Sequence, residues 1–84
     1  REILKVKIEE GERNDIFQTL QGLSTIGIVD FMKKEEGAFE VQSKPGVSSR
    51  REIFKLCVSK GWVLTEMTPI ETKLEDIFRE LTMN

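Results

Sequence analysis

Histidine is absent from the sequence, and cysteine occurs only once. Without histidine the chain has no imidazole for acid–base catalysis, for a Ser–His triad or for a metal site. A single cysteine permits neither an internal disulfide nor a zinc site built from cysteine alone. Apolar runs are short, such as Trp62–Leu64, whereas a membrane-spanning helix needs about 20 apolar residues. These absences exclude several classes of enzyme and predict that the chain does not insert into a membrane.

The net charge and the length of the chain further limit the functions and the number of domains that it can have. The 84 residues hold 13 Lys and Arg against 15 Asp and Glu, a net charge of -2, which argues against a dedicated nucleic-acid binder. Hydrophobic residues make up 38%, typical of a globular chain rather than a disordered one. The chain starts at Arg1, directly in strand-like sequence with no signal-peptide pattern. We therefore expect one small domain over residues 1–84, cut from a longer protein.

The first half of the chain predicts a strand, a helix and a hairpin. Ile3–Glu9 alternates apolar and charged residues, which indicates a half-buried strand. Residues 12–21 change to a helical period, with a start near Glu12 or Asn14 and an end at Gly22. The apolar positions of this helix are Ile16, Leu20 and Leu23. Residues 25–32 and 38–43 read as two strands joined by a short polar turn, as in a hairpin.

The second half repeats the plan and adds a helix. Ser49 and Glu52 have the spacing of a capping box, and the helix that follows ends at Gly61. Its apolar stripe is Ile53, Leu56 and Cys57, with Phe54 and Val58 beside it. Residues 62–67 form an expected fourth strand, which Pro69 ends. Thr72 and Glu75 repeat the capping-box spacing and open a third helix, whose apolar face is Leu74, Ile77, Phe78 and Leu81.

This order, strand–helix–strand–strand–helix–strand, is the ferredoxin-like βαββαβ arrangement. It predicts an α+β sandwich in which two helices cover one face of a four-stranded antiparallel sheet. The third helix must bury its apolar face on the open side of the sheet, on an edge, or on another polypeptide.

Each polar or reactive candidate has a structural reading beside the functional one. Cys57 lies on an apolar helix stripe, so we expect it to pack in the core. Ser48–Arg51 could bind phosphate at a helix start, but a capped helix followed by solvated arginines is favoured. The pairs Glu9–Glu10 and Glu35–Glu36 are expected at solvated turns, because adjacent strand residues point to opposite faces. No glycine-rich phosphate loop occurs, so we expect no cofactor site and no metal site here.

Phe39 and Trp62 can likewise have either a functional or a structural role. The segment Gly37–Val41 weakly resembles the third strand of an RNA-recognition motif, which stacks bases on exposed aromatic residues. Phe39 shares a face with Val41, and the first strand offers only Ile, Leu and Val, so we expect no RNA binding. Trp62 opens the last strand and is expected to pack in the core or at a sheet edge.

The most specific string is the run from Thr72 to Thr82, Thr-Lys-Leu-Glu-Asp-Ile-Phe-Arg-Glu-Leu-Thr. It resembles the ending of the ATP-binding subunits of ABC-2-type exporters, which close on a Ser/Thr-Leu-Glu-Asp/Glu-Val/Ile-Phe-Leu-x-Leu-Thr pattern. Upstream, Ile26–Ile28, Lys60–Trp62 and Thr68–Ile70 occupy matching places in that family's order of elements. Arg79 departs from the pattern, because the family often has Leu there.

The resemblance implies a non-catalytic accessory domain at the C-terminus of such a subunit, of the drug-exporter or gliding-motility type. The parent would bind ATP and Mg²⁺, hydrolyse ATP and lie on the cytoplasmic face of the cell membrane. The implied partners are the ATPase core of the same chain, a second ATPase subunit and a membrane permease. The domain would regulate coupling or support a dimer. Its expected interaction surface is Leu74, Ile77, Phe78 and Leu81, unless that face only covers the sheet.

The alternative is a small-molecule sensor. Amino-acid-binding regulatory domains of the ACT type share this order of elements and place a glycine-containing turn after the first strand, where Gly11 stands. They bind their ligands between paired domains. Calorimetry with a panel of amino acids separates the two hypotheses, since only the sensor should give heat.

Overall fold

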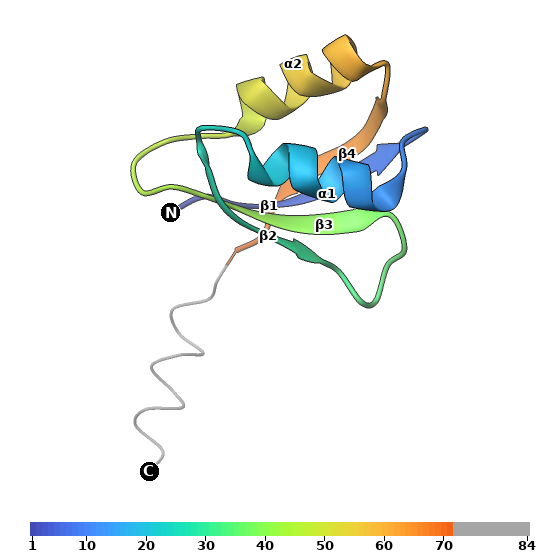
Figure 1. Cartoon of the computed structure of the whole chain (residues 1–84). Coiled ribbons are helices and arrows are strands. Elements are labelled where there is room, and N and C mark those ends of the chain that lie inside the picture. The colour runs from blue at the N-terminus through green and yellow to red at the C-terminus, as the bar shows by residue number, and fades with distance from the viewer. Residues whose placement is uncertain (72–84) are drawn as a thin grey trace.

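The computed structural model describes residues 1–71, which form four strands and two helices (Figure 1). The elements are β1 (Ile3–Glu9), α1 (Arg13–Gln21), β2 (Ile26–Phe31), β3 (Ala38–Ser43), α2 (Arg50–Lys60) and β4 (Val63–Pro69). The predicted order is confirmed. The last strand differs slightly, since it begins after Trp62 and includes Pro69. The expected third helix lies outside the described residues.

The strands form one antiparallel sheet in the order β2-β3-β1-β4. Both helices lie on the same face of this sheet, as Figure 1 shows. The first strand therefore lies between β3 and β4, which belong to the second strand–helix–strand unit of the fold. This interlocked order confirms the ferredoxin-like α+β sandwich.

Strand β1 shows how the sequence divides the two faces of the sheet. Leu4, Val6 and Ile8 are buried beneath the helices, whereas Lys5 and Lys7 lie on the open face. The alternation follows from the pleat, which sends successive side chains to opposite sides.

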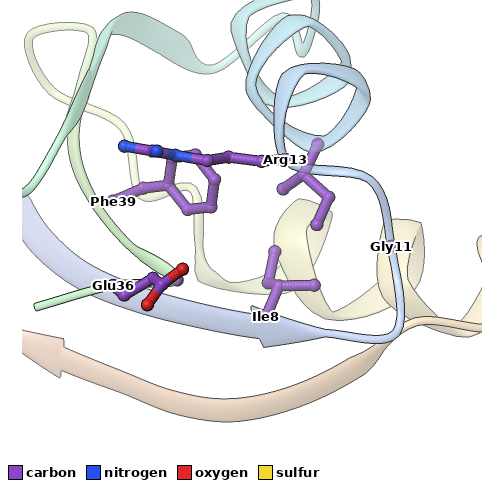
Figure 2. A pocket seen from close by; sticks show the side chains of 7 residues that line it. Ile8, Gly11, Arg13, Glu36 and Phe39 are labelled. Carbon is purple, nitrogen blue, oxygen red and sulfur yellow. The ribbon is translucent and has the colours of Figure 1, made fainter.

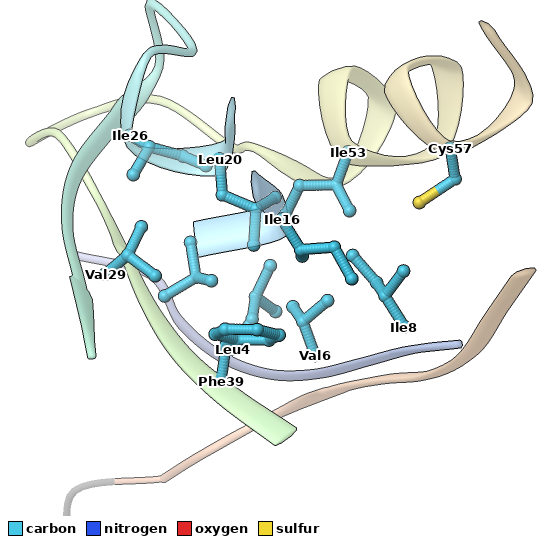
Figure 3. Close-up of a cluster of buried hydrophobic side chains, with 11 residues drawn as sticks. Leu4, Val6, Ile8, Ile16, Leu20, Ile26, Val29, Phe39, Ile53 and Cys57 are labelled. Atoms are coloured by element: carbon cyan, nitrogen blue, oxygen red, sulfur yellow. The ribbon is translucent and has the colours of Figure 1, made fainter. Parts of the chain in front are cut away.

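The core lies between the sheet and the two helices (Figure 3). It is built from aliphatic residues, one phenylalanine and the single cysteine: Leu4, Val6, Ile8, Ile16, Leu20, Ile26, Val29, Phe39, Val41, Ile53 and Cys57. Trp62, from the turn before β4, and Met67, from β4 itself, pack against this core. Burial of this apolar surface is the main source of the domain's stability.

The two helices begin differently. Glu12 caps α1, because its carboxylate accepts hydrogen bonds from the backbone amides of Asn14 and Asp15. The capping box predicted for α2 is wrong. The Ser49 hydroxyl is buried and lies 2.7 Å from the Ser43 hydroxyl, so it does not reach the helix amides.

The other member of the expected capping box is also engaged elsewhere. Glu52 accepts a 2.6 Å hydrogen bond from the Thr25 hydroxyl and a 3.2 Å bond from the Thr25 amide. Ser24 donates a third, 3.0 Å long. The hydrogen bonds to Thr25 and Ser24 lower the pKa of Glu52, and Lys44 adds to the effect against the opposing influence of burial. Glu52 thus ties α2 to the start of β2 instead of capping its own helix.

Candidate functional site

The start of α2, which the sequence offered as a phosphate site, already holds an anion. The carboxylate of Glu2 accepts 2.8 Å and 2.9 Å hydrogen bonds from the Ser48 hydroxyl and the Ser49 amide. Ser43 donates another at 2.8 Å, and the Arg50 guanidinium lies 3.4 Å away. The structural reading of this segment is therefore favoured, with an internal carboxylate in the place a phosphate would take.

Glu2 is held in its charged form. Burial alone would raise its pKa, but the hydrogen bonds from Ser49, Ser48 and Ser43, together with Arg50, lower the pKa below its ordinary value. The carboxylate joins the first residues of β1 to the end of β3 and the start of α2. Sequence reasoning missed this residue, because its partners lie more than 40 positions away in the chain.

Cys57 is confirmed as a core residue. Its side chain is buried under α2 among the aliphatic residues, as Figure 3 shows. Burial raises the pKa of the thiol, which disfavours the thiolate that nucleophilic chemistry needs.

The open face of the sheet carries ion pairs rather than aromatic residues. Glu35 binds Lys5 at 2.7 Å and Lys7 at 3.3 Å, and Glu66 lies 3.5 Å from Lys5. The hydrogen bond from Lys5 lowers the pKa of Glu35, with help from Lys7 against the effect of burial. Phe39 is buried on the opposite face. Within residues 1–71 no three acidic or cysteine side chains converge as metal ligands would.

A small pocket lies where the β1–α1 turn meets the hairpin between β2 and β3 (Figure 2). Its volume is about 140 Å³. Ile8, Ile16 and Phe39 form an apolar floor, and Arg13 and Glu36 supply opposite charges at the rim. The Arg13 guanidinium stacks over the Phe31 ring, 4.4 Å from its centre. The sequence predicted a glycine-containing turn at Gly11, but no pattern in the sequence predicted that Arg13 and Glu36 would lie at the rim of a pocket.

Gly11 itself is closed in from the other side by Trp62. A Cβ atom at Gly11 would lie 2.7 Å from the indole nitrogen of Trp62 and 2.9 Å from the end of Ile16. Trp62 is half-buried against the core, which confirms the expected packing role. The glycine is thus needed for close approach of the β1–α1 turn to Trp62, the residue directly before β4.

An apolar stripe lies on the outer side of α2. Phe54 and Val58 are 58% and 67% exposed, although their neighbours Ile53 and Cys57 are buried. We call Phe54 and Val58 the α2 outer stripe. Their spacing of four residues places them together on the helix surface, turned away from the inner stripe. Helical spacing predicted that Phe54 and Val58 lie beside the stripe of Ile53, Leu56 and Cys57, but it did not predict that they would be exposed.

The two edges of the sheet are treated differently. At β2, the Gln21 side chain donates to the Gly27 carbonyl and accepts from the Val29 amide, both at 3.1 Å. Gln21 thereby covers the outer backbone of that edge strand. At β4, no hydrogen bond among residues 1–71 reaches the outer edge of the strand. An uncovered edge strand is a surface on which another segment can pair or pack.

The sequence-predicted surface of Leu74, Ile77, Phe78 and Leu81 lies outside the described residues, so the structure does not place it. Neither a scan against protein-family models nor a search of curated proteins finds a match to this chain. Neither α1 nor α2 has the length and apolar character needed to cross a membrane.

Proposed function

We propose that this chain is a non-catalytic accessory domain that works through protein contacts, at the C-terminus of an ABC-2-type exporter's ATP-binding subunit. The observation that carries the proposal is the α2 outer stripe beside the outer edge of β4, with which no other strand of residues 1–71 pairs. An exposed apolar pair next to an open sheet edge is suited to contact with another polypeptide. The Thr72–Thr82 run supplies the link to exporter subunits, since it resembles their ending.

In this proposal the chemistry belongs to the parent subunit. The parent's ATPase core binds ATP with Mg²⁺, and the accessory domain regulates its coupling to the permease or supports pairing with a second subunit. The interaction surface of Leu74, Ile77, Phe78 and Leu81 stays a prediction. Gliding motility and drug export are both compatible parent activities.

The coding sequence directly upstream of Arg1 tests this proposal. We expect the same reading frame to carry a G-x-x-x-x-G-K-S/T loop and an ABC signature, because an ATP-binding subunit needs both. A frame with neither motif contradicts the exporter assignment. In the full-length subunit, Phe78→Ala should then weaken dimerisation or coupling while the ATPase core stays folded.

The pocket beside Gly11 supports a second candidate function, small-molecule sensing. Arg13 and Glu36 at its rim could pair with the carboxylate and ammonium groups of an amino acid above the apolar floor. However, about 140 Å³ is below the roughly 300 Å³ at which common ligand sites begin. Calorimetry with the common amino acids decides: the accessory-domain proposal expects no heat, and the sensor expects heat that Arg13→Gln abolishes.

A further inference from the structure

The sheet has two edge strands, β2 and β4, and neither of them has a regular outer edge. In the order β2-β3-β1-β4, the outer sides of these two strands have no neighbouring strand among residues 1–71. Backbone amides and carbonyls on such a side can pair with a strand of another polypeptide. Whether they do so here depends on the groups that each edge presents.

The sequence of β4 is suited to strand pairing. Val63, Leu64, Thr65 and Thr68 are β-branched or aliphatic residues that fit an extended backbone, and Glu66 is the only charged residue of the strand. Short segments of this kind are prone to pair with other chains when they lie at an edge and lack proline. A regular edge on β4 would therefore be a pairing site.

Pro69 removes one donor from the outer side of β4. The amide of Ile70 donates a 2.8 Å hydrogen bond to the carbonyl of Ile3, so the backbone of Ile70 faces β1. Successive residues of an antiparallel strand turn their backbone groups to opposite sides, and the backbone of Pro69 therefore faces away from the sheet. Because a proline nitrogen carries no hydrogen, an added strand would find no donor at this position.

A second irregularity of the β4 edge lies at Thr65. Glu66 pairs with Lys7 and Leu64 pairs with Ile8, so Thr65 is an extra residue without a partner on β1. Its hydroxyl donates a 3.2 Å hydrogen bond to the Lys7 carbonyl. An extra residue bends the strand and increases its twist, which moves the outer backbone groups out of line with a straight partner.

The regular stretch of the β4 edge between Thr65 and Pro69 is short. By the same alternation, Met67 turns its amide and carbonyl outward, whereas Glu66 and Thr68 turn theirs toward β1. A strand that paired here could form one regular pair before it met the extra residue on one side and the proline on the other. Such a contact is much shorter than the ladders that join the strands within the sheet.

Side chains of α1 occupy the edge of β2. The Gln21 side-chain amide binds the Gly27 carbonyl and the Val29 amide, the two outer groups that a peptide unit of an added strand would bind. Phe17, from the same helix, stacks on Phe31 at the end of β2, with 4.6 Å between the ring centres. The β2 edge is thus closed by side chains, whereas the β4 edge is closed by its own backbone.

We propose that both edges of the sheet are closed to strand addition, β2 by Gln21 and β4 by Thr65 and Pro69. A partner polypeptide then contacts side chains of the domain and does not extend its sheet, and a second copy does not join edge to edge. The closure of the edges is independent of the exporter assignment. Its consequence for the mode of contact rests on the proposed function, which supplies the partner.

Restoring a regular edge on β4 tests this inference in the full chain. Pro69→Val returns the outer amide, and deletion of Thr65 returns regular pairing while Leu64 and Glu66 keep their faces of the sheet. Sedimentation over a range of protein concentrations measures self-association. We expect each restored backbone hydrogen bond to raise the association constant by up to about tenfold over wild type. Pro45→Val is the matched control, because Pro45 is the other proline and lies in an exposed loop, and it should leave association unchanged.

Hydrogen exchange at the Met67 amide locates the association on the β4 edge. In wild type we expect this amide to exchange rapidly at every concentration, because it faces outward. In Pro69→Val its exchange should slow as the concentration rises, because a second copy supplies the acceptor.

Three results overturn the inference: a protected Met67 amide in wild type, unchanged association of Pro69→Val with a native circular dichroism spectrum, or association that leaves Met67 exchange unchanged. If deletion of Thr65 prevents folding, Pro69→Val alone decides, since it alters one exposed position. None of these results bears on the exporter assignment, which the upstream reading frame tests.

Discussion

At the scale of single residues, the Glu2 carboxylate links several polar groups of the described part of the chain. One carboxylate contacts the end of β3, the loop before α2 and the first residue of α2. Charged hydrogen bonds of this kind are stronger than neutral ones, and they leave the Ser49 amide satisfied. Glu2 thus takes the role predicted for Glu52, because it accepts the hydrogen bond from the Ser49 amide.

We predict that Glu2→Gln destabilises the domain by about 1–3 kcal/mol at neutral pH, because hydrogen bonds to a charged acceptor are replaced by weaker ones. The pKa of Glu2 is lowered on folding from its ordinary value of 4.5. The stabilisation is therefore complete above pH 4.5 and is lost as the pH falls through the lower folded-state value.

Urea titrations at a series of pH values measure this effect. The difference between wild type and Glu2→Gln should be constant around neutrality and shrink as the solution becomes acidic. A difference that is independent of pH down to the acid limit would contradict the assigned ionic role. Glu10→Gln is a matched control, since Glu10 is an exposed glutamate at the other end of β1.

At the scale of elements, the sequence predicted the strands and helices because each one has its own local signal. Alternation in β1, helical spacing in α1 and the glycine at position 61 all act within a few residues. Gly61 has a φ of 71°, a left-handed conformation that ends α2 and that glycine adopts without strain.

The features that the sequence did not predict share one cause, because each of them depends on residues that are distant in the sequence. The hydroxyl of Ser49 is drawn to Ser43 across the fold, so the local capping box does not form. Exposure of Phe54 depends on there being no strand or helix beyond β4 among the described residues. The pocket forms only where the β1–α1 turn approaches the β2–β3 hairpin.

The prediction at the scale of elements concerns the edge of β2 that the Gln21 side chain covers. Gln21→Ala removes two hydrogen bonds to the outer backbone of β2, and we expect a loss of about 1–2 kcal/mol. Hydrogen exchange at the Val29 amide should also accelerate, because its acceptor is gone. Gln18→Ala, at an exposed position on the same helix, should change neither quantity. Unchanged exchange at Val29 in Gln21→Ala would show that the side-chain cover has no protective role.

At the scale of the whole molecule, the two halves of the fold interlock. The first strand lies between β3 and β4, so neither half can keep its sheet if the other unfolds. Gly11 in the first half touches Trp62 in the second, which makes this contact a sensor of their junction. Trp62 is the single tryptophan, and its fluorescence reports on that junction alone.

We predict that unfolding followed by Trp62 fluorescence coincides with unfolding followed by far-ultraviolet circular dichroism, as in a two-state domain. Gly11→Ala should lower both midpoints together and reduce the free energy of unfolding by about 1–3 kcal/mol, because its Cβ would press on Trp62 and Ile16. Gly22→Ala is the matched control. A Cβ there meets the Thr19 carbonyl oxygen at 3.5 Å, an ordinary contact, and its φ of -82° suits alanine. Separate midpoints for the two probes would show that the halves unfold independently. Unchanged midpoints in Gly11→Ala would show that the Trp62 side chain can move aside without a loss of stability.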